Sequence, residues 1–185
     1  MFGYQPISYY GTWFVKSNYK QAHSKIAYMK LPKFHSDPDS NSTMSTTIKT
    51  IEKLNDIYPI NILVVDDNDS NLKLMTMQFR LQGFNVDVAQ NGYHACQLAA
   101  EKQYHLICMD IQMPVMNGIE ASKRILASAK GTIPHIVAVS CSLYDIVTED
   151  CKKAGIKELL AKPLSNQKVR QLIILAGTIA CSLKF

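Results

Sequence analysis

The sequence lacks several features that mark large classes of proteins. Its five cysteines, an odd number, have no Cys-x-x-Cys spacing, which argues against a zinc site and against a paired disulfide framework. The longest apolar run, 172–181, has about half of the roughly 20 residues that cross a bilayer. The N-terminus has no basic start followed by an apolar stretch, so no secretory signal is predicted. We therefore expect a reduced, cytoplasmic protein without a membrane segment.

Charge of one sign is not concentrated anywhere in the chain. The 185 residues include 20 Lys and Arg against 15 Asp and Glu, a formal net charge of +5 at pH 7. These residues are scattered rather than gathered into a basic face or run, so we expect no nucleic-acid partner. The length suits one domain of ordinary size plus an extension, with enough chain to bury a core.

The first part of the chain shows no regular pattern of apolar residues. Residues 1–35 contain nine of the sixteen aromatic residues, including the single tryptophan, but no sustained helical or strand period. Residues 36–58 open with Ser-Asp-Pro-Asp-Ser-Asn-Ser-Thr, a polar, turn-forming composition that is typical of a linker. We predict a poorly ordered aromatic-rich extension at 1–35, a linker at 36–58 and a folded domain at 59–185.

From residue 60 onward, short apolar runs alternate with segments of helical period. The predicted strands are 61–66, 84–88, 105–110, 135–140 and 158–161. Residues at helical spacing accompany them in four groups, which are Leu72, Met75 and Phe79; Ile119, Ser122 and Leu126; Leu143, Val147 and Cys151; and Val169, Leu172, Ala176 and Ile179. Strands that alternate with helices build a parallel sheet covered on both faces. The expected fold class is therefore α/β, a doubly wound five-stranded parallel sheet.

Reactive side chains stand at the ends of four predicted strands. Asp66 and Asp67 follow the first strand, Asp110 ends the third, Ser140 ends the fourth, and Lys162 follows the fifth. Ligands bind at the carboxyl ends of the strands in an open parallel sheet, so these five side chains are expected to converge at one edge. Three carboxylates repel one another in a partly desolvated cleft unless a cation lies among them. Oxygen ligands and an incomplete protein shell favour Mg²⁺.

This set of residues is suited to phosphoryl transfer, which needs mainly positioning and neutralisation of charge. Asp110 is the natural nucleophile, since a carboxylate can form an acyl phosphate directly. Lys162 supplies positive charge to the phosphoryl group, and the Ser140 hydroxyl can donate to one of its oxygens. Each residue alone has an ordinary explanation as a turn, cap or surface residue. Their joint occurrence at strand ends is what favours a phosphoacceptor site.

At these residues the sequence resembles the receiver domains of response regulators and hybrid histidine kinases. The resemblance covers roughly residues 60–180. It is especially close to the hybrid kinases in Ile-Leu-Val-Val-Asp-Asp-Asn-Asp-Ser-Asn at 62–71 and in Met-Asp-Ile-Gln-Met-Pro-Val-Met-Asn-Gly at 109–118. It implies a flavodoxin-like sheet of strand order 2-1-3-4-5. It also implies a function in two-component or phosphorelay signal transduction, with a histidine kinase or a histidine phosphotransfer protein as partner.

The resemblance also implies a role for each site residue. Asp110 would be phosphorylated, and Mg²⁺ would be bound by Asp66, Asp67, Asp110 and the backbone carbonyl of Gln112. Ser140 would be the switch hydroxyl and Lys162 the phosphate-binding lysine, which the family commonly joins to its proline through a cis peptide bond.

Two positions depart from the family's pattern. Leu159 stands three residues before Lys162, where the family usually has a Tyr or Phe that rotates inward on activation, so no aromatic switch is implied here. Ser140-Cys141 replaces the commoner Thr-Ala pair, and serine retains the hydroxyl that contacts phosphate. Gln112 and Ser142, which flank the pocket, would tune dephosphorylation.

Other functions compete with this interpretation. A phosphatase of the haloacid-dehalogenase kind also uses a strand-ending Asp, Mg²⁺ and a lysine, but it needs a second Asp two residues after the nucleophile as general acid. Gln112 occupies that position, so we expect no enzyme beyond self-catalysed phosphorylation and dephosphorylation. A receiver-like module that acts without phosphate, and a fragment of a hybrid histidine kinase, both stay open. His23 lacks the surroundings of a kinase histidine and is interpreted as an ordinary surface residue.

Overall fold

The computed structural model describes residues 53–141 and 148–182, and the following account concerns these residues alone. The predicted extension at 1–35 and most of the predicted linker lie outside them. Helices and strands follow one another in the order α1 (Leu54–Ile57), β1 (Ile62–Val65), α2 (Asp69–Leu81), β2 (Asp87–Ala89), α3 (Gly92–Glu101), β3 (Leu106–Met109), α4 (Gly118–Ser128), β4 (His135–Ser140), α5 (Thr148–Lys153), β5 (Glu158–Ala161) and α6 (Asn166–Ser182).

The five strands form one parallel sheet in the order β2-β1-β3-β4-β5. The central register aligns Val64 of β1 with Cys108 of β3, and Cys108 with Val137 of β4. Every residue of β1 and β3 is buried, as expected for central strands of a sheet covered on both faces. The predicted fold class and strand order are confirmed.

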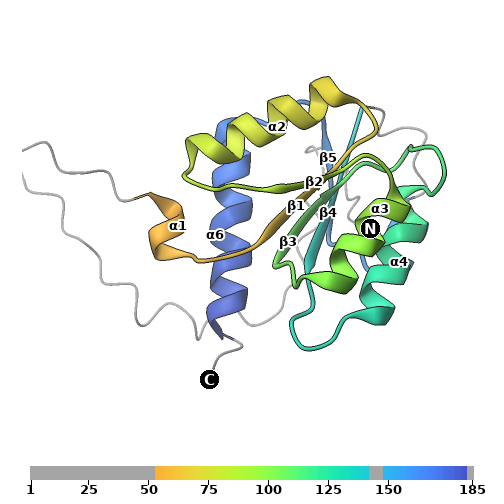
Figure 1. Cartoon of the computed structure of the whole chain (residues 1–185). Coiled ribbons are helices and arrows are strands. Elements are labelled where there is room, and N and C mark those ends of the chain that lie inside the picture. Colours follow the sequence, from red (N-terminus) through yellow and green to blue (C-terminus); the bar gives the residue numbers. More distant parts are fainter. Residues whose placement is uncertain (1–52, 142–147, 183–185) are drawn as a thin grey trace, which may run out of the picture. The chain divides into compact units, whose positions relative to one another are not determined.

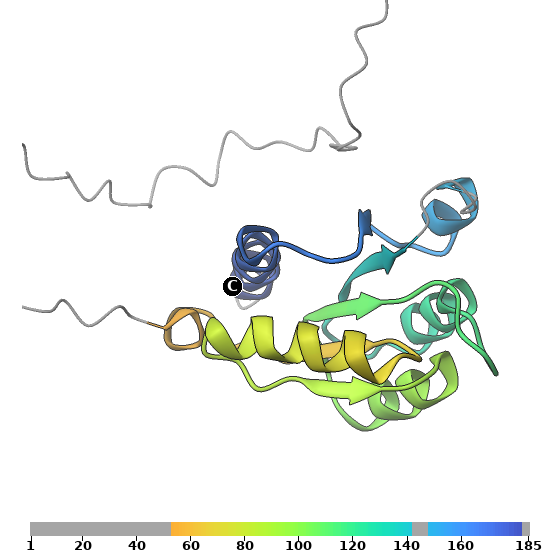
Figure 2. The same cartoon turned by 90° about the horizontal axis from the view of Figure 1, so that it is seen from above.

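Helices cover both faces of the sheet, with α2 and α6 on one face and α3 and α4 on the other (Figures 1 and 2). Alternate strand residues point to opposite faces, so Ile62 and Val64 enter the core under α2 and α6, whereas Leu63 and Val65 enter the core under α3 and α4. We call these two layers the α2–α6 core and the α3–α4 core. The reactive strand ends are thus held on a sheet that is fixed from both sides.

The second strand begins later than predicted, at Asp87 rather than residue 84. Phe84 is buried in the α2–α6 core and belongs to the end of helix α2, because its backbone N–H donates to the carbonyl of Phe79 over 3.1 Å. Gly83 makes this turn possible with a φ of 93°, a left-handed conformation that other residues adopt at a cost. The apolar residue that suggested a strand therefore closes a helix.

Part of the range that we predicted as linker is packed against the domain. Helix α1 begins at Leu54, which is 4% exposed and lies in the α2–α6 core. Tyr58 packs against the same core. Nothing in the sequence indicated this packing, because Leu54 stands between polar residues and a one-turn helix has too few residues to show an apolar period.

The predicted helices agree with the structure in part. Helix α3 forms at 92–101, for which the sequence analysis proposed no apolar repeat. Helix α5 has six residues and includes Cys151, whereas Leu143 and Val147 lie outside the described residues. In α6, Val169, Leu172 and Ala176 are buried as the repeat indicates. Ile179 is exposed, because the buried face of the helix continues through Ile173 and Gly177 and Ile179 lies to one side of it.

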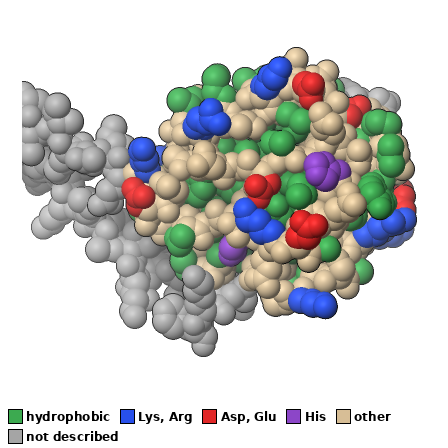
Figure 3. Space-filling view, in the orientation of Figure 1, with side chains coloured by type: hydrophobic (Ala, Val, Ile, Leu, Met, Phe, Trp, Pro, Cys, Tyr) green, Lys and Arg blue, Asp and Glu red, His purple; other side chains and the backbone are tan. Residues whose placement is uncertain are grey.

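The surface agrees with the scattered charges of the sequence. On the face seen in Figure 3, acidic and basic side chains are interspersed with hydrophobic ones. All five cysteines are free thiols. Across the part of the chain that the structure describes, no helix combines the length and apolar character that a membrane span requires.

Candidate functional site

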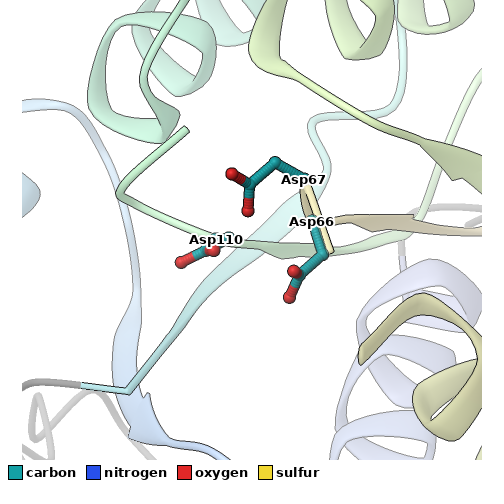
Figure 4. A group of neighbouring side chains, drawn as sticks. All are labelled: Asp66, Asp67 and Asp110. Atoms are coloured by element: carbon teal, nitrogen blue, oxygen red, sulfur yellow. The ribbon is translucent and has the colours of Figure 1, made fainter. Parts of the chain in front are cut away.

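The ends of β1 and β3 bring three carboxylates together, as Figure 4 shows. The sheet's hydrogen bonds continue into these residues, since the Asp66 N–H donates to the Ala89 carbonyl over 3.1 Å and the Asp110 N–H donates to the Val65 carbonyl over 2.9 Å. Asp66, Asp67 and Asp110 can each offer an oxygen such that the three atoms lie within 4.8 Å of one another. Asp66 and Asp110 are buried, and Asp67 is exposed.

Lys162 reaches this cluster from the end of β5. Its Nζ lies 2.5 Å from Asp66 Oδ2 and 2.8 Å from Asp110 Oδ2, and its side chain is 9% exposed. The backbone N–H of Lys162 donates to the Ser140 carbonyl over 2.9 Å, which fixes the start of its loop against the end of β4. The Lys162–Pro163 bond is cis, as the family resemblance implied.

The N-terminus of α2 orients the first carboxylate. Asp66 Oδ1 accepts hydrogen bonds from the Asn68 backbone N–H and from Asn71 Nδ2, both over 3.0 Å. Asn68 is also the N-cap of α2, because its side chain accepts from the N–H groups of Ser70 and Asn71. The tight turn after β1 therefore places a helix start and a buried carboxylate side by side.

Burial and like charge shape the electrostatics of the site. Burial raises the pKa of Asp110, with a smaller contribution from the charge of Asp66, although Lys162 pulls in the other direction. Burial alone would lower the pKa of Lys162, but its hydrogen bonds to Asp110 and Asp66 outweigh that effect and the pKa is raised. Lys162 therefore stays protonated.

Negative charge is in excess at this edge. Three carboxylates face one ammonium group, which gives the ionised cluster a formal charge of −2. A hard divalent cation fits such a set of oxygen donors, two of which are buried. The donor set of the described residues thus fits the Mg²⁺ site expected from the sequence.

The remaining predicted residues lie around this cluster. Ser140 is buried, 1% exposed, at the end of β4, next to Ala161 of β5 in the register. Gln112 is exposed in the loop that follows β3. Leu159 is partly buried against the α3–α4 core, where the family usually has an aromatic residue. Ser142 lies outside the described residues.

The loop between β3 and α4 holds Asp110 tightly. The Gly118 N–H donates to the Ile111 carbonyl over 2.9 Å, and a Cβ at Gly118 would lie 2.0 Å from the backbone oxygen of Asp110. Val115, in the same loop, has a φ of 70° and is 84% exposed, an uncommon conformation for a β-branched residue.

Sequence reasoning assigned no role to two residues that this geometry singles out. Asn71 contacts Asp66 from the first turns of α2, and Gly118 touches the Asp110 backbone. Both stand inside the two stretches that carry the family resemblance, at 62–71 and 109–118. Their place in these stretches could have suggested a role at the site. The contacts themselves depend on the conformations of the loops after β1 and β3.

A cavity of about 210 Å³ opens beside Lys162. It lies between α2 and the loop after β5, and Leu74, Met75, Pro163 and Leu164 provide its apolar walls. The polar groups that line it are Asn71, Gln78, Cys141 and Lys162. The cavity therefore adjoins the carboxylate cluster through Asn71 and Lys162, which both contact Asp66.

Comparison with known proteins identifies the family. The sequence model of the response regulator receiver domain matches residues 62–174, which is more than half of the chain. The chain belongs to this family. As a receiver domain it is homologous to the receivers of two-component and phosphorelay signalling proteins.

Individual relatives agree with this assignment. Hybrid signal transduction histidine kinase F of Dictyostelium discoideum is 31% identical over 116 residues, which cover 60% of this chain and 10% of that protein. The chain thus matches a small part of the kinase's length.

Solved receiver structures have the same fold. The receiver domain of sensor histidine kinase PA1611 from Pseudomonas aeruginosa PAO1, with magnesium in its active site cleft, is 29% identical with a TM-score of 0.57, and the match covers 62% of this chain and 93% of that one. The receiver domain of Saccharomyces cerevisiae Ssk1, in complex with the histidine phosphotransfer protein Ypd1, is 28% identical with a TM-score of 0.60 over 65% of this chain and 90% of the matched chain.

Proposed function

We propose that this receiver domain accepts a phosphoryl group on Asp110. The observation that carries the proposal is the position of Lys162 Nζ, between buried Asp66 and buried Asp110 at 2.5 and 2.8 Å. A protonated lysine beside the nucleophile can neutralise the charge of an incoming phosphoryl group, which is the main requirement of phosphoryl transfer.

The proposed step forms one bond and breaks one. A carboxylate oxygen of Asp110 attacks the phosphorus of a phosphohistidine, a P–O bond forms, and the P–N bond breaks. The electron pair of that P–N bond goes to the imidazole nitrogen of the donor. The other ring nitrogen of the phosphohistidine carries a proton, so the donor is released as neutral histidine. Lys162 and the Ser140 hydroxyl hold phosphoryl oxygens while the bond forms, and no separate general base is required because the nucleophile is already ionised.

Mg²⁺ is the cofactor in this proposal. Asp66, Asp67, Asp110 and the backbone carbonyl of Gln112 would hold it, and the bound ion would neutralise charge on the phosphoryl oxygens. The carboxylate cluster supports this, as does the magnesium in the related PA1611 receiver, which is 29% identical.

The proposed phosphodonor is a histidine kinase or a histidine phosphotransfer protein. The Ypd1 complex of the 28% identical Ssk1 receiver supports a phosphotransfer partner. We further propose that the chain acts in the cytoplasm and catalyses only its own phosphorylation and dephosphorylation. Free cysteines support a reducing compartment, and Gln112 in place of a second Asp supports the absence of phosphatase turnover.

Labelling of purified protein from acetyl phosphate or a phosphohistidine donor tests the acceptor residue. The wild type should take up label in the presence of Mg²⁺, and Asp110→Asn should take up essentially none because an amide cannot form the acyl phosphate. Asp87→Asn is the matched control, since Asp87 is also ion-paired, to Lys102, but lies on β2 away from the cluster. Equal labelling of Asp110→Asn and the wild type would refute the proposal, as would a wild type that takes no label.

A further inference from the structure

Beyond the residues that the proposed reaction uses directly, we propose that Asn71 is a positioning residue that sets the orientation of the Asp66 carboxylate for metal binding. The inference rests on the proposed Mg²⁺ site. It assigns to Asn71 a role in cation affinity rather than in contact with the phosphoryl group.

The two oxygens of Asp66 have different partners. Oδ1 accepts from the Asn68 backbone N–H and from Asn71 Nδ2, both over 3.0 Å. Oδ2 faces Lys162 Nζ at 2.5 Å. Asp66 is 0% exposed, so in the folded protein these groups, and not bulk water, surround its two oxygens. The donors on Oδ1 therefore decide which way Oδ2 points.

Of the two donors on Oδ1, only Asn71 can be changed without altering the backbone. The Asn68 donor is a backbone N–H and persists whatever residue stands there. Asn71 reaches Asp66 from α2, whereas Lys162 reaches it from the end of β5, so the carboxylate is held from two elements. Loss of the Asn71 amide would leave Asp66 Oδ1 with the Asn68 N–H as its remaining donor among the described residues.

The neutral charge of the Asn71 amide matters as much as its hydrogen bond. An amide donor orients the carboxylate and leaves the three carboxylates and Lys162 together at a formal charge of −2. A second lysine or arginine in that place would also donate to Oδ1, but it would cancel charge that attracts a divalent cation. Asn71 therefore fixes geometry without competing with the ion.

Hydrogen bonds to ligating carboxylates commonly change metal affinity by about 10- to 100-fold when they are removed. Asn71→Leu has a similar volume and no donor, and Asn71→Ala favours the helix, so at least one of the two should fold. We expect both to weaken Mg²⁺ binding about tenfold or more. The Mg²⁺ concentration for half-maximal labelling should rise by the same factor, whereas the rate at saturating Mg²⁺ should change little, because Asn71 is not proposed to contact phosphate.

Isothermal titration calorimetry with Mg²⁺ alone gives the direct readout, and circular dichroism confirms that each variant is folded. Asn91→Ala is the matched control, because the Asn91 side chain caps α3 by accepting from the His94 N–H over 2.9 Å and its loss removes an asparagine bond at another helix start. It should destabilise the fold without weakening Mg²⁺ binding. If the wild type binds Mg²⁺ and both Asn71 variants bind it equally well, the positioning role is overturned alone. If the wild type binds no Mg²⁺, both the proposed metal site and the positioning role of Asn71 are refuted.

Discussion

The two ends of the sheet use their charged side chains differently. At the carboxyl end, Asp66, Asp67 and Asp110 share one lysine, and burial raises the pKa of Asp110. At the amino end, Asp87 has Lys102 Nζ at 2.6 Å and the Tyr104 hydroxyl at 2.8 Å, and the hydrogen bond from Lys102 lowers its pKa. One end thus gathers like charges, and the other pairs opposite charges.

The amino end also connects its loops through neutral hydrogen bonds. The Asn61 backbone N–H donates to His105 Nδ1 over 3.0 Å, and Asn61 Nδ2 donates to the Gln103 carbonyl over 2.9 Å. Gln103 Nε2 then donates to the Lys130 carbonyl over 2.9 Å. These bonds join the segments before β1, β3 and β4 through neutral groups.

One edge of the sheet has balanced charges, and the opposite edge carries the proposed phosphoacceptor site. Unbalanced carboxylates cost folding free energy unless a cation joins them, so their presence indicates a site. Paired charges and neutral networks carry no such cost and indicate structure alone. Substitutions matched between the two ends test this distinction.

The largest effect is expected from glycine substitution at the reactive end. A Cβ at Gly118 would lie 2.0 Å from the Asp110 backbone oxygen, which cannot move without displacing the proposed acceptor residue. Gly118→Ala should lower the free energy of unfolding by about 3 kcal/mol or more and abolish labelling. Gly131→Ala is the counterpart, with a φ of 86° but no neighbour closer than Gln103 Nε2 at 3.2 Å, and should cost about 1–2 kcal/mol with labelling retained. Urea denaturation measures both; equal costs would contradict the contact.

An intermediate effect is expected from pH at the amino end. Burial lowers the pKa of His135 from its usual 6.5, although Glu158 opposes this and Lys157 and Lys168 add to it. As pH falls below 6.5 the unfolded chain takes up this proton before the folded protein does, so stability is lost from there down to the folded pKa. The slope for one proton cannot exceed about 1.4 kcal/mol per pH unit.

Denaturation at pH 7.5 and 5.5 tests this, with His135→Gln as the comparison. The protein that keeps His135 should lose more stability between the two pH values than the His135→Gln variant, whose side chain does not titrate. Both proteins should carry Asp110→Asn, because the raised pKa of Asp110 acts with the opposite sign and would stabilise the folded protein as pH falls. Equal losses in the two proteins would show that His135 makes no contribution.

The smallest effect is expected from two exposed apolar residues. Val115, at a φ of 70°, lies in the loop after Asp110, and Ile133 lies before β4 at the amino end, 62% exposed. Val115→Gly should change stability by less than about 1 kcal/mol, because relief of the left-handed conformation offsets the greater freedom of glycine in the unfolded chain. Ile133→Gly has no such relief and should lower stability by about 0.5–1 kcal/mol. A larger loss for Val115→Gly would mean that its conformation is not strained.

The sequence alone determined the fold class and the members of the reactive edge, for a physical reason. Strand and helix periods depend on neighbours close along the chain, and a parallel sheet places all strand ends of one kind at the same edge. The sequence therefore predicted that Asp66, Asp110 and Lys162 lie at one edge. In the structure, Lys162 Nζ lies 2.5 Å from Asp66 Oδ2 and 2.8 Å from Asp110 Oδ2.

The tertiary structure decided what depends on packing between distant segments. Strand β2 begins later than predicted, because Phe84 packs at the end of α2. Leu54 is buried in the core although its neighbours in the sequence are polar. The Asn71–Asp66 bond and the approach of Gly118 to Asp110 come from the way two loops fold back, which no residue period encodes. Local pattern fixed which residues stand at strand ends, and three-dimensional packing decided how those residues are oriented.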